Sequence, residues 1–376
     1  MIFWRARIDR FSRVLCLRFG LNRERSKLAR AGPPRAMQPS ISLWQRYKLR
    51  LKRRRYLWRS FRSRHSLKRL AFQGVPEHGV LVFSVVRNEA TRLPFFLDFY
   101  RKAGVSQFFI VDNGSDDGSL EFLLEQPDCA VWQTSASYRD ARFGLNWLNW
   151  LMIRYGHNRW CLMADADELL VYDGDDISDL NGLTQTLEDK GHMAFGAMML
   201  DLYPKGALGE QEYTAGQDPR EVLTHFDDGP YRQVWQMPKG NLWLQGGMRE
   251  RVFFEEKPEQ SPTLNKIPLI KWNRRFAWVN SCHSLLPPNL NTLYDGPGGK
   301  TPSGALLHTK FLPEIVSKSE TERQRQQHFH DPTLFDPYYQ AIENKPVLWN
   351  EHSKPYEGSA QLARLGLISK KDWLAS

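Results

Sequence analysis

Short apolar runs alternate with amphipathic segments from residue 79 onward, and this alternation predicts the fold class. Buried strands are expected at 79–86, 106–113, 129–134 and 159–164. Helices are expected between them, at 93–104, 118–126 and 143–156, where the apolar positions recur on one helical face. Strands and helices of this length in alternation indicate βαβ units. The expected fold is therefore α/β, with a mostly parallel sheet and helices on both faces.

The two ends of the chain differ from this central region. Residues 1–74 form a basic N-terminal arm, expected to be partly helical or disordered and broken by the proline-containing stretch 31–40. Within the arm, residues 41–70 interleave Leu, Trp and Tyr with clustered Lys and Arg, a pattern typical of a basic amphipathic helix. Beyond residue 175 the pattern weakens into loops and short strands. We therefore expect a central domain at 75–320 and a helical C-terminal extension at 321–376.

The charge of the chain is divided unevenly between the arm and the rest. The net charge is +10, but residues 1–72 hold 22 Lys and Arg against two acids, which leaves 30 basic and 40 acidic residues for 73–376. A basic arm on an acidic body indicates an anionic partner, held by the arm. Three interpretations of residues 41–72 stay open: attachment to an anionic membrane surface, which we favour; packing on the acidic body of the protein; and contact with nucleic acid. An acidic body disfavours the last.

The spacing of the cysteines and the length of the apolar stretches indicate where in the cell the protein is expected. Cys16, Cys129, Cys161 and Cys282 show no spacing typical of a zinc site or a redox pair, so we expect buried thiols in a reducing compartment. No apolar stretch reaches the roughly 18–20 residues of a membrane-spanning helix. Arginines interrupt the first 20 residues, which disfavours a secretory signal. The expected location is cytoplasmic, peripherally associated with the inner face of the membrane.

Two carboxylate clusters follow predicted strands, and the carboxyl ends of strands are where open α/β sheets bind ligands. Asp112 ends the second strand and opens the loop DNGSDDGS, while Asp165, Asp167 and Glu168 follow the fourth strand. Three acids within four residues repel one another and need a cation or several hydrogen-bond donors. Mg²⁺ or Mn²⁺ would supply that charge and would also bind a diphosphate. The alternative is a helix start capped by Asp165 or Asp167.

Motifs of other enzyme classes are missing from the sequence. No G-x-G-x-x-G follows the first strand, which disfavours a dinucleotide-binding dehydrogenase. GPGGKT at 296–301 resembles a phosphate-binding loop, but Tyr294 occupies the position of the first glycine. Neither G-x-S-x-G nor H-E-x-x-H occurs, so esterase and zinc-protease chemistry have no support.

Several segments together resemble a known family of enzymes. VVRNEATRLPFFLDFYRKAGVSQFFIVDNGSDDGS at 85–119, followed by LMADADELLVY at 162–172, resembles the bacterial family 2-like glycosyltransferases of the GT-A fold, in the branch with a D-x-D-E motif. The similarity continues through 137–150, 245–254, 264–272, 280–287 and 305–312. It covers most of residues 79–312 and does not include the arm.

This resemblance implies roles for individual residues. Asp112 would hydrogen-bond the base of a nucleotide-sugar, Asp165 would face the ribose and the metal, and Asp167 would coordinate the metal. A late histidine often completes such a metal site, and the two candidates are His283 and His308. The residues implied to line the nucleotide pocket are Arg87, Asn88 and Glu89.

A glycine pair precedes a charged segment later in the chain. Gly246 and Gly247 indicate either a close backbone approach to the ligand, with Arg249 and Arg251 available to the diphosphate, or a tight strand turn. The resembled enzymes generally invert the anomeric centre, which requires a carboxylate base near the acceptor hydroxyl. Glu250 and Asp201 are the candidate bases, with Glu250 preferred for its place beside the glycines.

These inferences predict a metal-dependent, inverting glycosyltransferase. It would move a sugar from a nucleoside-diphosphate sugar to a hydroxyl of a saccharide or glycolipid, in cell-surface polysaccharide synthesis. A nucleotidyltransferase using the same carboxylates is one alternative. A nucleic-acid-binding protein acting through its basic arm is the other.

Overall fold

The computed structural model describes residues 41–325 and 336–372, which lie in one compact unit. The predictions for Cys16, for the break at 31–40 and for the rest of residues 1–40 lie outside the described residues. So do residues 326–335 and the last four residues of the predicted C-terminal extension.

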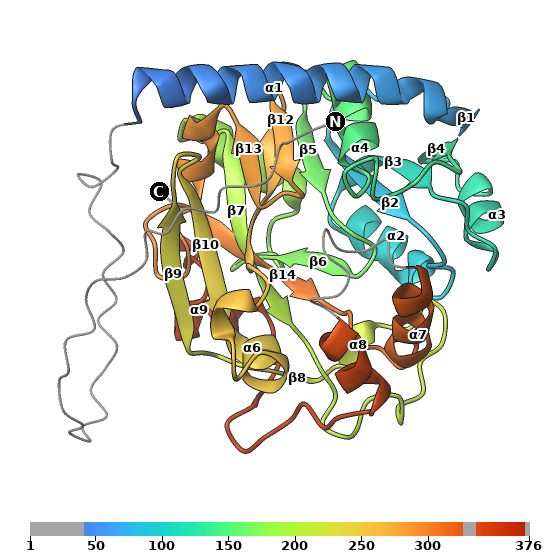
Figure 1. Cartoon of the computed structure of the whole chain (residues 1–376), viewed down its shortest axis with the longest axis vertical. Helices are drawn as coiled ribbons and strands as arrows, with labels where there is room; N and C mark the ends of the chain where they lie inside the picture. The colour runs from blue at the N-terminus through green and yellow to red at the C-terminus, as the bar shows by residue number, and fades with distance from the viewer. Residues whose placement is uncertain (1–40, 326–335, 373–376) are drawn as a thin grey trace, which may run out of the picture. The chain divides into compact units, whose positions relative to one another are not determined.

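A nine-stranded mixed sheet forms the centre of the described chain, with strand order β1-β4-β3-β2-β5-β11-β7-β14-β6 (Figure 1). Strands β2, β3, β4, β5, β7 and β14 run in one direction, and β1, β11 and β6 run against them. The first half of the sheet comprises β1 (Lys68–Ala71), β4 (Cys129–Gln133), β3 (Val105–Asp112), β2 (Val80–Val86) and β5 (Trp160–Met163). The second half comprises β11 (Asn265–Lys271), β7 (Ala194–Asp201), β14 (Ser303–His308) and β6 (Glu168–Val171).

The predicted α/β fold is confirmed, and the first half of the sheet matches the sequence pattern closely. β2, β3, β4 and β5 fall within a residue or two of the four predicted strands. The three predicted helices are α2 (Leu93–Lys102), α3 (Ser119–Leu124) and α4 (Leu145–Tyr155). These elements match because each strand is a continuous apolar run and each helix has a clear stop signal.

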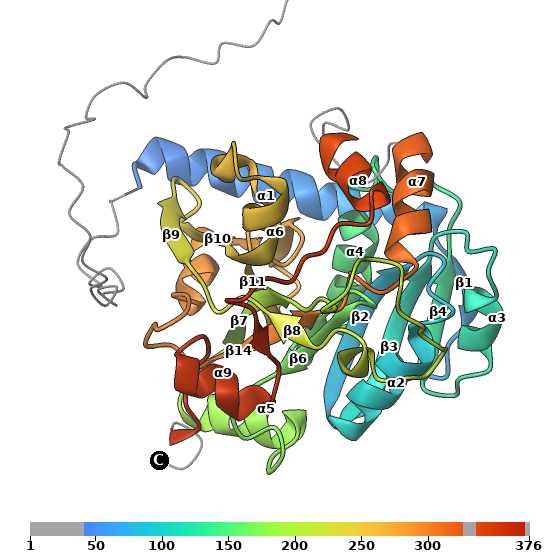
Figure 2. The ribbon, with the colours of Figure 1, turned by 90° about the horizontal axis from the view of Figure 1, so that it is seen from below.

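Helices cover both faces of the sheet, as the continuous burial of its strands requires. Alternate residues of β2 point to opposite faces, so Val80 and Val82 pack with α2 and α5 (Leu180–Asp189), while Leu81 and Phe83 pack with α4. Figure 2 shows α4 on one side of β2 and β3, and α2 on the other. This packing fixes the carboxyl ends of β2, β3 and β5 along one edge.

The region after residue 175 is more regular than its sequence pattern predicts. Beside the central strands it contains a hairpin of β9 (Tyr231–Gln236) and β10 (Asn241–Gly246), which leads into α6 (Gly247–Phe253). A third apolar cluster joins this part to the C-terminal helices through Phe226, Tyr339 and Leu362. Smaller elements are β8 (His225–Phe226), β12 (Ala277–Asn280), β13 (Ser284–Leu286), β15 (Lys354–Pro355) and the 3-10 helices η2 (Arg64–Ser66), η3 (Pro219–Glu221), η4 (Pro258–Gln260) and η5 (Pro288–Leu293). The C-terminal helices are α7 (Ile315–Arg325), α8 (Asp336–Glu343) and α9 (Ser359–Leu365).

The described part of the predicted arm packs on the rest of the chain. Helix α1 (Leu43–Ser63) begins at a capping box formed by Ser42 and Gln45, and it lies along α4. Strand β1 then adds an antiparallel edge to β4, which the sequence pattern did not indicate. Among the helices of residues 41–325 and 336–372, none combines the length and apolar character needed to cross a membrane. Cys129, Cys161 and Cys282 are buried free thiols.

Candidate functional site

Three polar side chains lie in a row across neighbouring strands at one edge of the sheet. In the ladders that flank β14, His308 is the register partner of Asp201 on β7 and of Glu168 on β6. All three residues are buried. Nδ1 of His308 lies 2.6 Å from Oδ1 of Asp201. Strand register therefore brings together residues that are far apart in the sequence.

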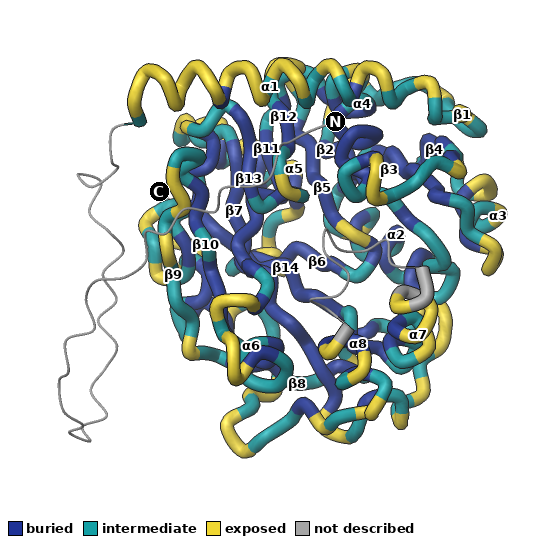
Figure 3. The backbone as a smooth tube through the Cα atoms, in the orientation of Figure 1, coloured by how far each residue is buried: buried dark blue, intermediate teal, exposed yellow. Residues whose placement is uncertain are grey.

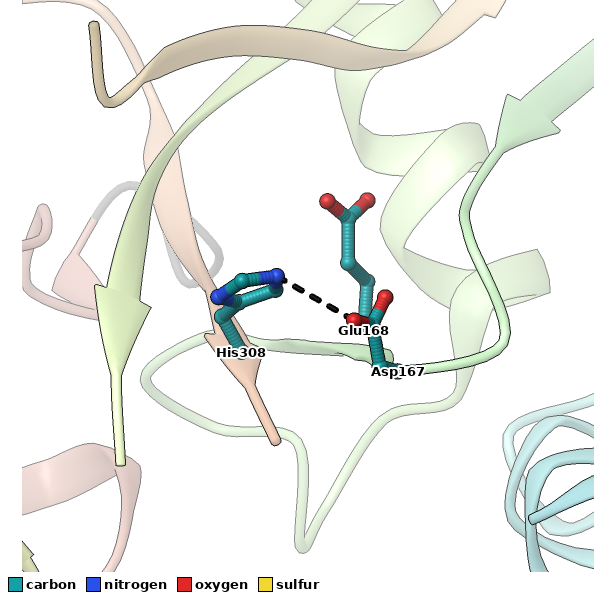
Figure 4. A group of neighbouring side chains, drawn as sticks. All are labelled: Asp167, Glu168 and His308. Carbon is teal, nitrogen blue, oxygen red and sulfur yellow. Dashed lines mark ion pairs between the residues drawn. The ribbon is translucent and has the colours of Figure 1, made fainter. Parts of the chain in front are cut away.

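Asp167 completes this row from the turn before β6. Its Oδ2 lies 3.3 Å from Nε2 of His308, and Figure 4 shows the two side chains facing each other. The turn is held in place by the backbone N–H of Thr309, which donates to the carbonyl oxygen of Asp167 at 2.7 Å. Burial raises the pKa of the Asp167 carboxyl, but the charge and hydrogen bond of His308, together with Arg92 and Lys310, lower it well below its usual range. Asp167 is therefore ionised.

The same residues fit a divalent cation. Asp167, Glu168 and His308 each offer a ligand atom, and these three atoms lie within 4.8 Å of one another. Metal-binding histidines usually donate their second ring N–H to a carboxylate, and Asp201 stands in that position on Nδ1. Without a cation, burial lowers the pKa of His308, but the carboxylates of Asp167 and Asp201 outweigh this effect and raise that pKa. A bound cation would take the place of the proton on Nε2, which faces Asp167. Asp165, whose side chain is about half exposed, adds a further carboxylate nearby.

A buried lysine shares this site, and sequence analysis did not identify its role. Nζ of Lys266 forms an ion pair with Glu168 and lies 3.7 Å from Oδ2 of Asp165. Burial, with Asp165 and Asp167 adding to it, raises the pKa of Glu168 to about 7, although Lys266 acts in the opposite direction. The lysine balances part of the charge of Glu168 and Asp165. Nothing local could have indicated it, because Lys266 is 98 positions from Glu168 and looks like any strand-end lysine.

Asp201 is held from its other side by an arginine. Nε and Nη2 of Arg249 donate to the two oxygens of Asp201 at 2.7 and 2.8 Å, and both side chains are buried. Burial raises the pKa of Asp201, but Arg249 and His308 lower it to about 2. A carboxylate this acidic, with both oxygens engaged, is a poor proton acceptor. Its contacts favour a role in orienting His308.

The second carboxylate cluster lies at the ends of β2 and β3. Asp112 is fully buried and accepts hydrogen bonds from the backbone N–H groups of Gly114, at 3.0 Å, and Ser115, at 3.3 Å. Asn88 has φ +53° and exchanges two hydrogen bonds with Asp116. Arg87 donates through Nη1 to the carbonyl oxygen of Asn113 at 2.9 Å. These contacts lock the two loops against each other at the edge where Asp165 begins its turn.

Glu89 and a buried arginine connect the two clusters. Oε2 of Glu89 lies 2.9 Å from Nη1 of Arg92 and 2.9 Å from Nζ of Lys318. Arg92 also reaches the carbonyl oxygen of Lys310, the residue after Thr309. The loop after β2 is thus tied to the strand that carries His308.

Other predicted site residues have different surroundings. Glu250 is paired with Arg232 and accepts a hydrogen bond from Oγ of Ser261 at 2.7 Å. Arg251 pairs with Asp227 instead of being available to a diphosphate. His283 lies outside the Asp167, Glu168 and His308 group.

Gly246 and Gly247 lie where a side chain would collide with neighbouring residues. Gly246 has φ +132°, and a Cβ there would lie 2.1 Å from the carbonyl oxygen of Pro230. A Cβ on Gly247 would meet the ring of Tyr231 at 3.1 Å. The close approach inferred from sequence is therefore met within the chain, at the turn from β10 into α6.

His283 is a neutral histidine in this structure. Its Nδ1 lies 2.6 Å from the carbonyl oxygen of Asn265, so Nδ1 carries the proton that is donated. Burial, with the charges of Lys266 and Arg249, lowers its pKa to about 3.

The alternative of a capped helix start at Asp165 or Asp167 does not hold, because the turn leads into strand β6.

Comparisons with known proteins add little. No family model and no curated protein sequence matches the chain. Among solved structures, a 4-diphosphocytidyl-2C-methyl-D-erythritol synthase is 14% identical with a TM-score of 0.24, covering 38% of this chain and 66% of that one. A mannosyltransferase from Pyrobaculum calidifontis, in complex with GDP-Man and Mn²⁺, is 14% identical with a TM-score of 0.28, covering 81% of this chain and 78% of that one. Similarities this weak support no inference by themselves.

Proposed function

We propose that the chain is a metal-dependent glycosyltransferase that moves a sugar from a nucleoside-diphosphate sugar to a hydroxyl of a saccharide or glycolipid. The observation that carries the proposal is the row of Asp201, His308 and Asp167 at the carboxyl edge of the sheet. A carboxylate and a histidine backed by a second carboxylate form a set suited to a divalent cation. The loops after β2 and β3 lie at the same edge, where α/β sheets bind nucleotides.

Asp167 and His308 would hold the cation, Mn²⁺ or Mg²⁺, with Asp165 as a further ligand. A bound divalent cation neutralises diphosphate oxygens and stabilises the departing nucleotide. Asp201 and Arg249 keep the ring of His308 turned towards Asp167. Lys266 forms an ion pair with Glu168, so Glu168 would balance the lysine instead of adding a third negative ligand.

The nucleotide would bind over the loops after β2 and β3. Arg87, Asn88 and Glu89 would form the wall of this pocket, and Asp112 would keep its loop in shape through the amides of Gly114 and Ser115. Asp112 is fully buried, so a contact with the base needs a small opening of that loop.

The acceptor base is the least defined part of the proposal. Of the two candidates, Asp201 is engaged on both oxygens and is strongly acidic, so we retain Glu250. An inverting transfer needs one base on the acceptor hydroxyl while the nucleoside diphosphate leaves from the opposite side. The proposed setting is cell-surface polysaccharide synthesis on the cytoplasmic side of a membrane.

A thermal-shift screen of nucleotides with and without Mn²⁺ tests the proposal. A ligand that binds only the folded state at 100 times its dissociation constant adds about 2.7 kcal/mol of stability. A nucleoside diphosphate should raise the melting temperature more with Mn²⁺ than without it. Stabilisation by nucleoside triphosphates alone, with release of pyrophosphate in a coupled assay, would indicate a nucleotidyltransferase instead.

A further inference from the structure

Helix α1 is fixed on the body of the protein by one face. Leu49 and Ser60 are buried, and the ring of Tyr56 stacks under the guanidinium of Arg142, with Cζ at 3.6 Å from the ring centroid. At the end of the helix, Phe61 meets Trp150 edge to face at 5.7 Å. Leu49, Tyr56 and Ser60 are seven and four residues apart, so they lie on one side of the helix. The opposite side has a fixed direction relative to the sheet.

That opposite side is apolar and exposed. Leu43, Tyr47, Leu51 and Trp58 share one stripe of the helix and are 82%, 51%, 44% and 57% exposed, with Trp44 beside them at 62%. Figure 3 shows exposed positions along the whole length of α1, with covered positions only from Leu49 onward. A helix that packs on its own protein normally turns its polar side outward. Here the large apolar side chains face solvent.

Basic side chains border this stripe, and no acid interrupts it. Nine of the 21 residues of α1 are Lys or Arg and none is Asp or Glu. Cations lie over the exposed rings: Nζ of Lys48 is 5.0 Å from the Trp44 ring, and Cζ of Arg62 is 4.9 Å from the Trp58 ring. The charge continues onto neighbouring elements. Burial and nearby arginines, Arg275 among them, lower the pKa of Arg53. Burial and the charge of Lys52 lower the pKa of Lys239.

We propose that the outer face of α1 lies on an anionic lipid surface, with its tryptophans and leucines inserted at the level of the headgroups. Trp, Tyr and Leu bordered by Lys and Arg are the composition of interfacial helices, where apolar insertion adds to attraction by anionic lipid. Nucleic acid would bind the basic side chains that border this face. It would not explain the exposed leucines in the stripe, because leucine makes no favourable contact with phosphate. The proposal holds whether or not the proposed transferase activity does.

Co-sedimentation of the full chain with vesicles tests this surface. The protein should sediment with vesicles of phosphatidylcholine and phosphatidylglycerol. Much less of it should sediment with vesicles of phosphatidylcholine alone. High salt should weaken the binding without abolishing it, because salt screens the charges and not the apolar insertion.

Two variants separate the contributions, each with a matched control. Trp44→Ser with Trp58→Ser should weaken binding about tenfold or more, while Ile177→Ser, an exposed apolar residue outside α1, should not change it. Arg54→Gln, Arg55→Gln and Arg62→Gln together should weaken binding to the anionic vesicles about tenfold or more, while Lys354→Gln, Lys370→Gln and Lys371→Gln should leave it unchanged.

Any one of four results would overturn the proposal. Pelleting that ignores lipid charge, or that survives both α1 variants, would mean that another part of the chain binds the vesicles. Binding of duplex DNA or RNA that needs the same residues, without vesicle binding, would identify a nucleic-acid surface. A dimer that dissociates in the tryptophan variant, again without vesicle binding, would assign the face to a second copy of the chain. None of these measurements depends on transfer activity.

Discussion

At the scale of single residues, Asp167 is the side chain on which the proposed metal site most depends. We predict that Asp167→Ala removes the Mn²⁺-dependent rise in melting temperature and lowers transfer at least about 100-fold, which corresponds to about 2.7 kcal/mol in the barrier. Asp176→Ala, which removes an exposed acid from the segment after β6, is the matched control and should change neither. If Asp167→Ala keeps a normal Mn²⁺ response, the metal site lies elsewhere.

Lys266 tests whether the ion pair with Glu168 is needed for folding. Removing one partner of a buried pair leaves the other charge without compensation and costs about 3–5 kcal/mol. Lys266→Met should therefore lower the free energy of unfolding in urea by about that amount. The double variant Lys266→Met with Glu168→Gln should recover more than half of the loss. A single variant that costs less than about 1 kcal/mol would show that Glu168 protonates easily without its partner.

Glu250 is the proposed base, and its two contacts supply the competing interpretation. Glu250→Gln should lower kcat strongly and leave donor binding nearly unchanged, because a base acts mainly in the transition state. Ser261→Ala removes one hydrogen bond to Glu250 but keeps the carboxylate, so it should have a small effect on kcat. Should Glu250→Gln reduce stability and not kcat, Glu250 is a structural partner of Arg232.

At the scale of elements, the start of α6 positions Arg249 and through it Asp201 and His308. Gly246→Ala places a Cβ against the carbonyl oxygen of Pro230 at an unfavourable φ, so it should destabilise the protein by about 3 kcal/mol in urea unfolding. Gly240→Ala, at φ +66° with nothing within 4 Å, should cost only about 1 kcal/mol. Equal losses would mean that strain, and not the close approach to Pro230, dominates.

The elements also show what the sequence could predict. Between residues 80 and 163 the strands are continuous apolar runs and the helices are amphipathic segments with clear stop signals. Their type and bounds were therefore predictable. β7 and β14 were missed because AFGAMMLD and SGALLH contain glycine and no β-branched residue, and β11 was missed because Pro268 lies inside it. The missed strands carry Asp201, Lys266 and His308. The acids of the DADE segment were visible locally, but their partners depend on strand register, which only the folded sheet provides.

Register also separates the two candidate histidines. No local feature of the sequence distinguishes His283 from His308. In the structure, His308 stands between Asp201 and Glu168 in the ladders that flank β14, while His283 is tied to the carbonyl oxygen of Asn265. The pair Arg249 and Asp201 was predicted as two separate functions, a diphosphate contact and a base. Their mutual contact favours one shared role in holding His308.

At the scale of the whole molecule, the loops proposed to bind the nucleotide, the residues proposed to bind the metal and the outward face of α1 all belong to one compact unit. If α1 lies on a membrane, its contacts with α4 hold the sheet edge in a constant orientation to the lipid surface. A lipid-linked acceptor would then reach the site along a defined direction.

Release of nucleoside diphosphate from nucleoside-diphosphate sugars, measured after chelation and after Mn²⁺ is restored, tests the central proposal most directly. The full chain is incubated with a panel of donors and saccharide or glycolipid acceptors, and the acceptor mass is followed in parallel. We predict that nucleoside diphosphate appears together with an acceptor heavier by one sugar, only when Mn²⁺ or Mg²⁺ is present and not with Asp167→Ala. Undiminished transfer in chelator, or pyrophosphate as the released product, would contradict a metal-dependent glycosyltransferase built on Asp167 and His308.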